Sequence, residues 1–208
     1  MNSKGKLFII SGPSGVGKST IRERIINTHN NFWYSISMTT RTPREGEINE
    51  KDYYFVTKKE FIKNIKEDNF FEYAEVYKDV FYGTPKNKVI EKLENGINVL
   101  LEIDVKGALN IKNKYHEAIL IFIYPPSIEE LKKRLLQRQT DNKNVIEERI
   151  SKAQYEISFK DRYDYIITNN KLEIAIKNIQ NIIEKELKKH WYEPRFLDTR
   201  SEVFIWQN

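Results

Sequence analysis

Short apolar runs recur along the chain, with amphipathic segments between most of them. The four clearest are residues 7–11 (LFIIS), 97–103 (INVLLEI), 118–124 (AILIFIY) and 163–168 (YDYIIT). Apolar runs of this length are typical of strands buried on both faces, and the helical segments between the last three favour parallel pairing with right-handed crossovers. The pattern therefore predicts an α/β fold with a parallel sheet flanked by helices.

Two stretches depart from this alternation. Residues 32–84 carry aromatic and β-branched runs broken by the polar turn RTPREGEINEKD, which predicts a small, mixed α+β insertion with mostly antiparallel strands. Residues 128–160 form a charged helical pair around TDNKN, with no strand between the helices, which is typical of an external lid. The predicted division is a core (1–31, 96–127 and 161–190), an insertion (32–95), a lid (128–160) and a tail of unknown role (191–208).

Polar residues mark where several helices begin. Thr57 with Glu60, and Ser127 with Glu130, have the spacing of capping boxes. Thr84 stands before a proline, which predicts that Thr84 caps a helix whose first residue is that proline.

Composition narrows the class of partner without identifying it. The 208 residues include 35 Lys and Arg against 30 Asp and Glu, a net charge of +5 that suits a phosphate-bearing partner, nucleotide or nucleic acid alike. The chain has no cysteine, which excludes disulfides, a thiol nucleophile and cysteine-ligated metal. No run approaches the ~20 apolar residues that span a bilayer, and the N-terminus lacks a signal-like apolar region. We expect a cytoplasmic protein without a membrane or nucleic-acid partner.

The segment GPSGVGKS at residues 12–19 has the GxxxxGK[ST] pattern. Its glycines let successive backbone N–H groups turn around a phosphate at a helix N-terminus, whose dipole favours anions. Lys18 would then reach the terminal phosphates, and Ser19 would ligate Mg²⁺. An ordinary glycine-rich turn is the alternative, but the strand before the loop and the helix after it favour a nucleotide-binding P-loop.

Charged side chains elsewhere in the sequence could bind the phosphates and the metal of the nucleotide held by the P-loop. Glu102 and Asp104 end the second strand, where they are either solvated carboxylates or acidic groups near the metal, and Asp104 is the better placed. Arg134 and Arg138 share one helix face, and Arg149 lies on the next helix. The alternative for the arginines is a solvated basic surface, but beside a P-loop they could neutralise charge on a transferred phosphoryl group.

Another set of residues suits a phosphate monoester. Arg41 and Arg44 flank a turn with Tyr53 downstream, and each arginine can bind two phosphate oxygens. An exposed basic hairpin is the alternative.

Glu72 is a candidate for reading a base. A carboxylate can accept hydrogen bonds from both N1–H and the 2-amino group of guanine, whereas adenine would leave the charge unpaired. Thr84 or Ser37 could donate a hydroxyl to O6. A solvent-facing position on a strand is the alternative for Glu72.

Several segments occur together and in order: SGPSGVGKST, SMTTRTPREGE, KDYYFV, FFEYAEV, FYGTP and LLEIDVKGA. In these motifs and in the arginine spacing, the chain resembles guanylate kinases over about residues 5–188. The resemblance implies a P-loop core with a GMP-binding insertion and a lid, and the Mg²⁺-dependent reaction ATP + GMP ⇌ ADP + GDP, extending to dGMP. This chain has one residue more between Glu72 and Tyr82 than is usual in guanylate kinases.

The resemblance also implies site residues. Guanine contacts fall on Ser37, Glu72, Thr84 and Asp104, and contacts to the GMP phosphate on Arg41, Arg44, Tyr53 and Tyr82. ATP contacts fall on Gly12, Pro13, Ser14, Gly15, Val16, Gly17, Lys18, Ser19, Thr20 and Asn169. The implied catalytic residues are Lys18, Arg41, Arg134, Arg138 and Arg149, and the metal ligand is Ser19, with Asp104 acting through water.

Three rival functions stay open from the sequence. A nucleoside monophosphate kinase for another acceptor would share the loop. A non-catalytic guanylate-kinase-like interaction module would share the fold, but such modules have damaged loops, whereas Lys18 and Ser19 are intact here. A nucleic-acid-binding ATPase would be stimulated by RNA or DNA. We expect the two-nucleotide kinase, with the insertion and the lid closing over both substrates to exclude water.

Overall fold

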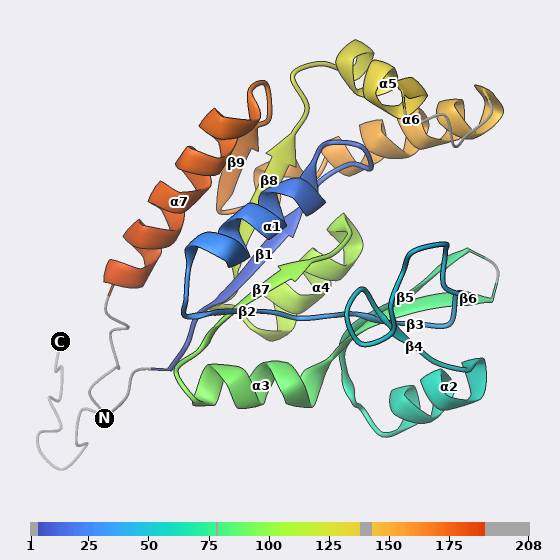
Figure 1. Cartoon of the computed structure of the whole chain (residues 1–208), viewed down its shortest axis with the longest axis vertical. Coiled ribbons are helices and arrows are strands. Elements are labelled where there is room, and N and C mark those ends of the chain that lie inside the picture. The colour runs from blue at the N-terminus through green and yellow to red at the C-terminus, as the bar shows by residue number, and fades with distance from the viewer. Residues whose placement is uncertain (1–3, 78, 138–142, 190–208) are drawn as a thin grey trace, which may run out of the picture.

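A computed structural model describes residues 4–77, 79–137 and 143–189 (Figure 1). Within them, the core is a parallel sheet of five strands in the order β2-β7-β1-β8-β9. Its strands are β1 (Leu7–Ser11), β2 (Phe32–Tyr34), β7 (Asn98–Glu102), β8 (Ile119–Tyr124) and β9 (Tyr165–Thr168). The predicted parallel sheet is therefore confirmed, and the four apolar runs supply β1, β7, β8 and β9.

Helices cover both faces of this sheet because its strands are apolar on both sides. On the core sheet lie α1 (Lys18–Thr28), α3 (Lys86–Glu94), α4 (Val105–Lys114) and α7 (Leu172–Lys188). Helix α2 (Lys58–Lys66) packs beneath the second sheet, and α5 (Ile128–Gln137) and α6 (Lys143–Ile157) form the helical pair, both described below. Leu7 and Ile9 of β1 belong to a buried cluster with α3 and α4, whereas Phe8 and Ile10 belong to one with α1 and α7. No helix in the described ranges is long and apolar enough to cross a membrane.

A second, smaller sheet lies beside the core. Its order is β4-β3-β6-β5, formed by β3 (Met38–Thr39), β4 (Tyr54–Phe55), β5 (Phe70–Tyr77) and β6 (Val80–Pro85). The β5–β6 and β3–β6 pairs are antiparallel, as predicted, but β3 and β4 run parallel. Phe61 of α2 is fully buried beneath this sheet and stacks on Phe70 at 4.5 Å, so the lobe has an aromatic cluster of its own.

The predicted insertion (32–95) includes residues at both of its ends that pack with the core. Residues 32–34 form β2, which pairs with β7 at the edge of the core sheet because Trp33 can pack there with the core's apolar residues. Helix α3 packs on the core through Val89 and Leu93. The β5–β6 register shifts between Phe70 and Glu72 and again between Glu75 and Tyr77, and Glu72 pairs with Thr84 in the regular stretch between the two shifts.

The predicted helical pair is present as α5 and α6, which pack against each other. Leu131 and Leu135 of α5, and Ile146 and Ala153 of α6, are buried in the cluster that includes α1. In Figure 1 this pair and the small sheet project from the core to the same side. The polar stretch between the helices (138–142) and the tail from 190 onward lie outside the described residues.

Two of the three predicted caps form at the predicted residue. Thr57 and Glu60 make a complete capping box, and the Ser127 hydroxyl accepts the backbone N–H of Glu130 at 3.1 Å. The Thr84 cap was a wrong prediction. Pro85 itself is the N-cap of α3, because Thr84 belongs to β6 and donates its hydroxyl to Glu72 instead.

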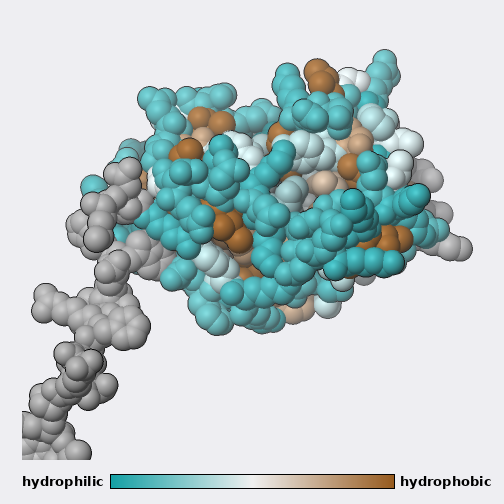
Figure 2. All heavy atoms as spheres, turned by 90° about the horizontal axis from the view of Figure 1, so that it is seen from below, coloured by the Kyte–Doolittle hydropathy of each residue, from teal (hydrophilic) through white to brown (hydrophobic). Residues whose placement is uncertain are grey.

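The face of the molecule seen in Figure 2 is mostly hydrophilic, with isolated hydrophobic side chains.

Candidate functional site

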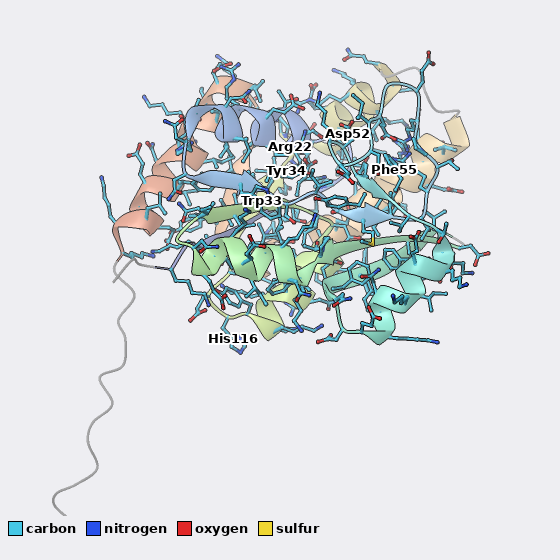
Figure 3. The ribbon with its side chains drawn as sticks, turned by 60° about the horizontal axis from the view of Figure 1, so that its bottom comes forward. Arg22, Trp33, Tyr34, Asp52, Phe55 and His116 are labelled. Atoms are coloured by element: carbon cyan, nitrogen blue, oxygen red, sulfur yellow. The ribbon has the colours of Figure 1, made fainter. Side chains whose placement is uncertain are left out.

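A cleft of about 520 Å³ opens between the carboxyl end of the core sheet, the small sheet and α6. It is where open α/β sheets bind ligands. Figure 3 shows Arg22 and Tyr34 on the core side of this region and Phe55 on the small lobe. The structure brings these predicted site residues to the cleft: Ser14, Lys18, Ser19, Ser37, Arg41, Arg44, Tyr53, Glu72, Tyr82, Asp104 and Arg149.

The loop between β1 and α1 has the conformation that its glycines allow. Gly12 and Gly17 have positive φ values of 142° and 97°. A Cβ on Gly12 would lie 2.3 Å from the Ile123 carbonyl oxygen, and one on Gly17 would lie 2.7 Å from Asn169 Nδ2. The Lys18 ammonium donates to the carbonyl oxygens of Gly12 at 2.7 Å and Pro13 at 3.1 Å. The lysine is thus folded over its own loop, at the N-terminus of α1.

A carboxylate stands against the serine that follows this lysine. Ser19 Oγ donates to Glu102 Oε1 at 3.1 Å, and Arg22 lies 3.6 Å from the other oxygen of Glu102. Asp104, which the sequence favoured for this position, instead caps α4 by accepting the backbone N–H of Gly107 at 2.8 Å. The hydroxyl of Ser19 and the carboxylate of Glu102 are the oxygen ligands that Mg²⁺ prefers.

On the small lobe, Arg41 is held on several sides. Its Nε donates to the Tyr82 hydroxyl at 3.0 Å, and its two Nη atoms donate to the two carboxylate oxygens of Glu47 at 2.8 and 2.9 Å. The backbone N–H of Arg44 also donates to Glu47, at 2.7 Å. The ring of Tyr53 lies 5.4 Å from the Arg41 guanidinium. From the sequence we expect each arginine to bind two phosphate oxygens, and in this structure the two Nη atoms of Arg41 donate to Glu47.

Glu72 is buried, with 8% of its surface exposed, on the strand next to the cleft. The Thr84 hydroxyl donates to its Oε1 at 2.8 Å. Gly107 leaves room on the other side, since a Cβ there would lie 2.8 Å from Oε2. Burial raises the pKa of Glu72 to about 7, with the nearby Asp104 adding to the rise and the Thr84 hydrogen bond opposing it. The site thus contains a desolvated carboxylate with spare acceptor capacity.

The helical pair contributes unequally to the cleft. Arg149, Lys152 and Glu156 of α6 line it. Burial raises the pKa of Glu156, and the positive charge of Lys18 opposes that rise, so a lid carboxylate faces the loop lysine. Arg134 does not line the cleft, because it donates to the Asn169 carbonyl oxygen at 3.2 Å and to Glu130 at 3.1 Å. Arg138 lies outside the described residues.

Asn169 is hydrogen-bonded both to the glycine-rich loop and to Arg134. Its side-chain amide donates to the Val16 carbonyl oxygen at 2.8 Å, while its own carbonyl accepts from Arg134. It is 5% exposed, so these bonds fix its position. Gly15, Val16 and Thr20 belong to the same loop and the first turn of α1 but do not line the cleft themselves.

Sequence reasoning missed five charged residues at the cleft: Arg22, Glu47, Asp52, Lys152 and Glu156. Glu47 had a signal, because it follows Arg41 and Arg44 in one short turn, where a carboxylate can pair with a guanidinium. Glu156 had none, since on the sequence it is one charge among many on a polar helix. Only the packing of α6 over the loop identifies it.

Comparisons with known proteins agree with this geometry. The family model described as guanylate kinase matches residues 4–186. The chain is 51% identical to a guanylate kinase of Clostridium tetani over 88% of this chain and 87% of that protein, and 49% identical to one of Clostridium acetobutylicum over 89% and 88%. Its structure resembles the crystal structure of guanylate kinase from Anaplasma phagocytophilum with a TM-score of 0.74 at 34% identity, covering 90% of this chain and 89% of that one.

Proposed function

The chain belongs to the guanylate kinase family, and we propose that it carries out its ATP:GMP phosphotransfer in the cleft described above. The reaction converts ATP and GMP to ADP and GDP. The same base and phosphate are present in dGMP, so we extend the proposal to that acceptor. A cytoplasmic site of action fits these substrates and a chain that needs no disulfides.

The observation that carries the assignment of the acceptor is Glu72. A buried carboxylate that already accepts from Thr84 can still accept hydrogen bonds from N1–H and the 2-amino group of guanine. Adenine would set a lone pair against it and leave a buried charge without a partner, a design that can discriminate by ~10⁴–10⁵. Ser37 and Asp104 also line this part of the cleft.

The two phosphates would meet between the lobes. On the donor side, the loop N–H groups, Lys18 and Arg149 would hold the ATP phosphates. On the acceptor side, Arg41, Arg44 and the tyrosine hydroxyls would hold the GMP phosphate. A phosphomonoester has a second pKa of ~6, so its oxygen is already largely ionised at neutral pH and needs no strong general base. Attack on the γ-phosphorus then forms the new P–O bond as the bond to ADP breaks.

Mg²⁺ would accompany ATP. Ser19 and Glu102 provide oxygen ligands 3.1 Å apart beside the loop, and Asp104 would act through water. When bound, the ion neutralises charge on the ATP phosphates. The protein's own part is to position the two nucleotides, since it must bring together two anions that repel each other.

An acceptor panel tests the proposal. GMP, dGMP, AMP, CMP and UMP are each offered with ATP, and ADP release is followed in a coupled assay. We expect turnover with GMP and dGMP and at least ~10³-fold lower kcat/KM with the others. Preference for AMP, CMP or UMP would exclude the assignment of Glu72 to guanine. Stimulation by RNA or DNA in place of a mononucleotide would favour the ATPase instead.

A further inference from the structure

Glu47 lies in the turn that carries both acceptor-side arginines. The turn is closed by the backbone N–H of Glu47 donating to the Arg44 carbonyl oxygen at 3.1 Å, and the Glu47 carboxylate accepts the Arg44 N–H at 2.7 Å. Two hydrogen bonds between the same two residues, one between their main chains and one from the Arg44 main chain to the Glu47 carboxylate, leave little freedom for the glutamate. The side chain of Glu47 is 19% exposed, so it is largely shielded within the site.

The Arg41 guanidinium has little hydrogen-bonding capacity left. Nε donates to Tyr82, Nη1 donates to the Thr42 carbonyl oxygen at 2.7 Å and to Glu47, and Nη2 donates to Glu47. Within the described part of the chain, the second hydrogen of Nη2 is the one donor of Arg41 without an acceptor in these bonds. A planar guanidinium bound on so many sides is fixed in orientation.

From this arrangement we propose that Glu47 is a positioning residue for GMP phosphorylation, which fixes the Arg41 guanidinium so that a single N–H faces the acceptor phosphate. The inference rests on the proposed function, because it concerns the phosphate of the same acceptor. The Arg44 side chain also lines the cleft, and among the described residues no carboxylate binds its guanidinium on two sides as Glu47 binds Arg41. Arg44 would therefore bind two phosphate oxygens and supply the net positive charge.

The pairing explains how the site keeps two arginines close together without strong repulsion. The Arg41 guanidinium holds the pKa of Glu47 below its usual range, so Glu47 stays ionised at neutral pH. The Arg41–Glu47 pair is then neutral, and Arg44 contributes the net charge. The alternative is that Glu47 occupies the place of the acceptor phosphate and must be displaced by it, in which case removing its charge would tighten GMP binding.

A double-mutant cycle separates these roles. Glu47→Gln keeps the size of the side chain but replaces one acceptor oxygen with an NH₂ group that opposes an Arg41 donor. We expect KM for GMP to rise about tenfold, with kcat and the KM for ATP within about twofold, because loss of a charge-assisted hydrogen bond has roughly this effect. In an Arg41→Ala background the same substitution should change KM for GMP less than twofold, because its partner is gone.

The matched control is Glu45→Gln, which removes the same charge from an exposed position two residues away in the same turn and should leave all constants unchanged. An unchanged or lower KM for GMP in Glu47→Gln would overturn the proposal, the lower value in favour of competition with the phosphate. An undiminished effect in the Arg41→Ala background would also overturn it. If the parent enzyme instead prefers another acceptor, the proposed function fails, which the acceptor panel detects independently.

Discussion

At the scale of single residues, Glu72 is a proposed binding group that the fold buries, and burial disfavours the charged form that would bind guanine. Its carboxylate is buried before any ligand is bound, and burial raises its pKa to about 7. The charged form is the one that can accept both guanine N–H groups, so the free protein holds this group near the midpoint of its titration at neutral pH. Guanine donors would favour the charged form and draw the proton off.

The titration of Glu72 predicts a pH dependence. In the free enzyme the carboxyl is protonated below its pKa of about 7, so kcat/KM for GMP should fall as the pH drops from 8 to 6. GMP itself gains a proton near pH ~6, which adds a second step. We expect Glu72→Gln to lose the step near 7 and keep the lower one. Identical profiles for the two enzymes would show that Glu72 does not titrate in this range.

A substitution at Lys18 tests phosphoryl transfer separately from GMP binding. The Lys18 ammonium lies over the loop carbonyls on the core side of the cleft, whereas Glu72, the residue that we propose to read guanine, lies on the small lobe. Replacement by alanine should lower kcat by at least ~10²-fold, since a charge that stabilises the transferred phosphoryl group is lost. Calorimetric titration should give a Kd for GMP within about twofold of the parent. A large loss of GMP affinity would mean that Lys18 serves the acceptor as well.

At the scale of elements, the sequence predicts best where one local pattern decides the structure. The apolar runs of β1, β7 and β8 are buried on both faces, and the loop from Gly12 to Ser19 has its positive φ values at Gly12, Gly15 and Gly17, where glycine adopts them without strain. Thr84 was predicted as a helix cap because local spacing cannot reveal Glu72 across the β5–β6 pair. Trp33 was assigned to the insertion because an aromatic strand can join either sheet until packing decides.

The site residues likewise fall into two groups, those that a local motif identifies and those that depend on contacts between elements. Lys18 and Ser19 are identified by a local motif. The partners of Arg41 and the position of Glu156 depend on contacts between elements, such as α6 packing above the loop, which periodicity does not encode. Arg134 was expected over the phosphates from its spacing, but the structure joins it to Asn169 instead.

Helix α6 and the small lobe lie on opposite sides of the cleft, and we expect them to approach each other when both nucleotides are bound. The chain has no cysteine, so a labelled pair can be introduced cleanly at exposed positions, Lys63→Cys on α2 and Glu147→Cys on α6. Energy transfer between the labels should increase with GMP and a non-hydrolysable ATP analogue together, and less with either alone.

The control pair is Asn110→Cys on α4 and Lys177→Cys on α7, both exposed on the core. Its transfer should stay constant through the titration. If the first pair also stays constant with both nucleotides present, the elements do not close, and water must be excluded in another way.

At the scale of the whole molecule, the core and the small lobe face one cleft, and Phe71 of β5 joins them because it is buried in the core cluster with α3 and α4. The aromatic cluster of Phe61, Phe70 and Phe81 belongs to the small lobe, while the core clusters surround the parallel sheet. In the proposed function, Glu72 on the small lobe would bind guanine and the loop on the core would hold the ATP phosphates, so the phosphates would meet only when both nucleotides are bound.

The most direct test of this account compares GMP and AMP as acceptors for the parent enzyme and for Glu72→Gln. A glutamine can offer one acceptor to guanine but cannot pair with both donors, and its NH₂ can donate to adenine N1. The account predicts that kcat/KM for GMP falls by at least ~10²-fold and that the GMP-to-AMP ratio falls with it. A variant that keeps the parent's ratio would contradict the claim that this buried carboxylate selects the acceptor.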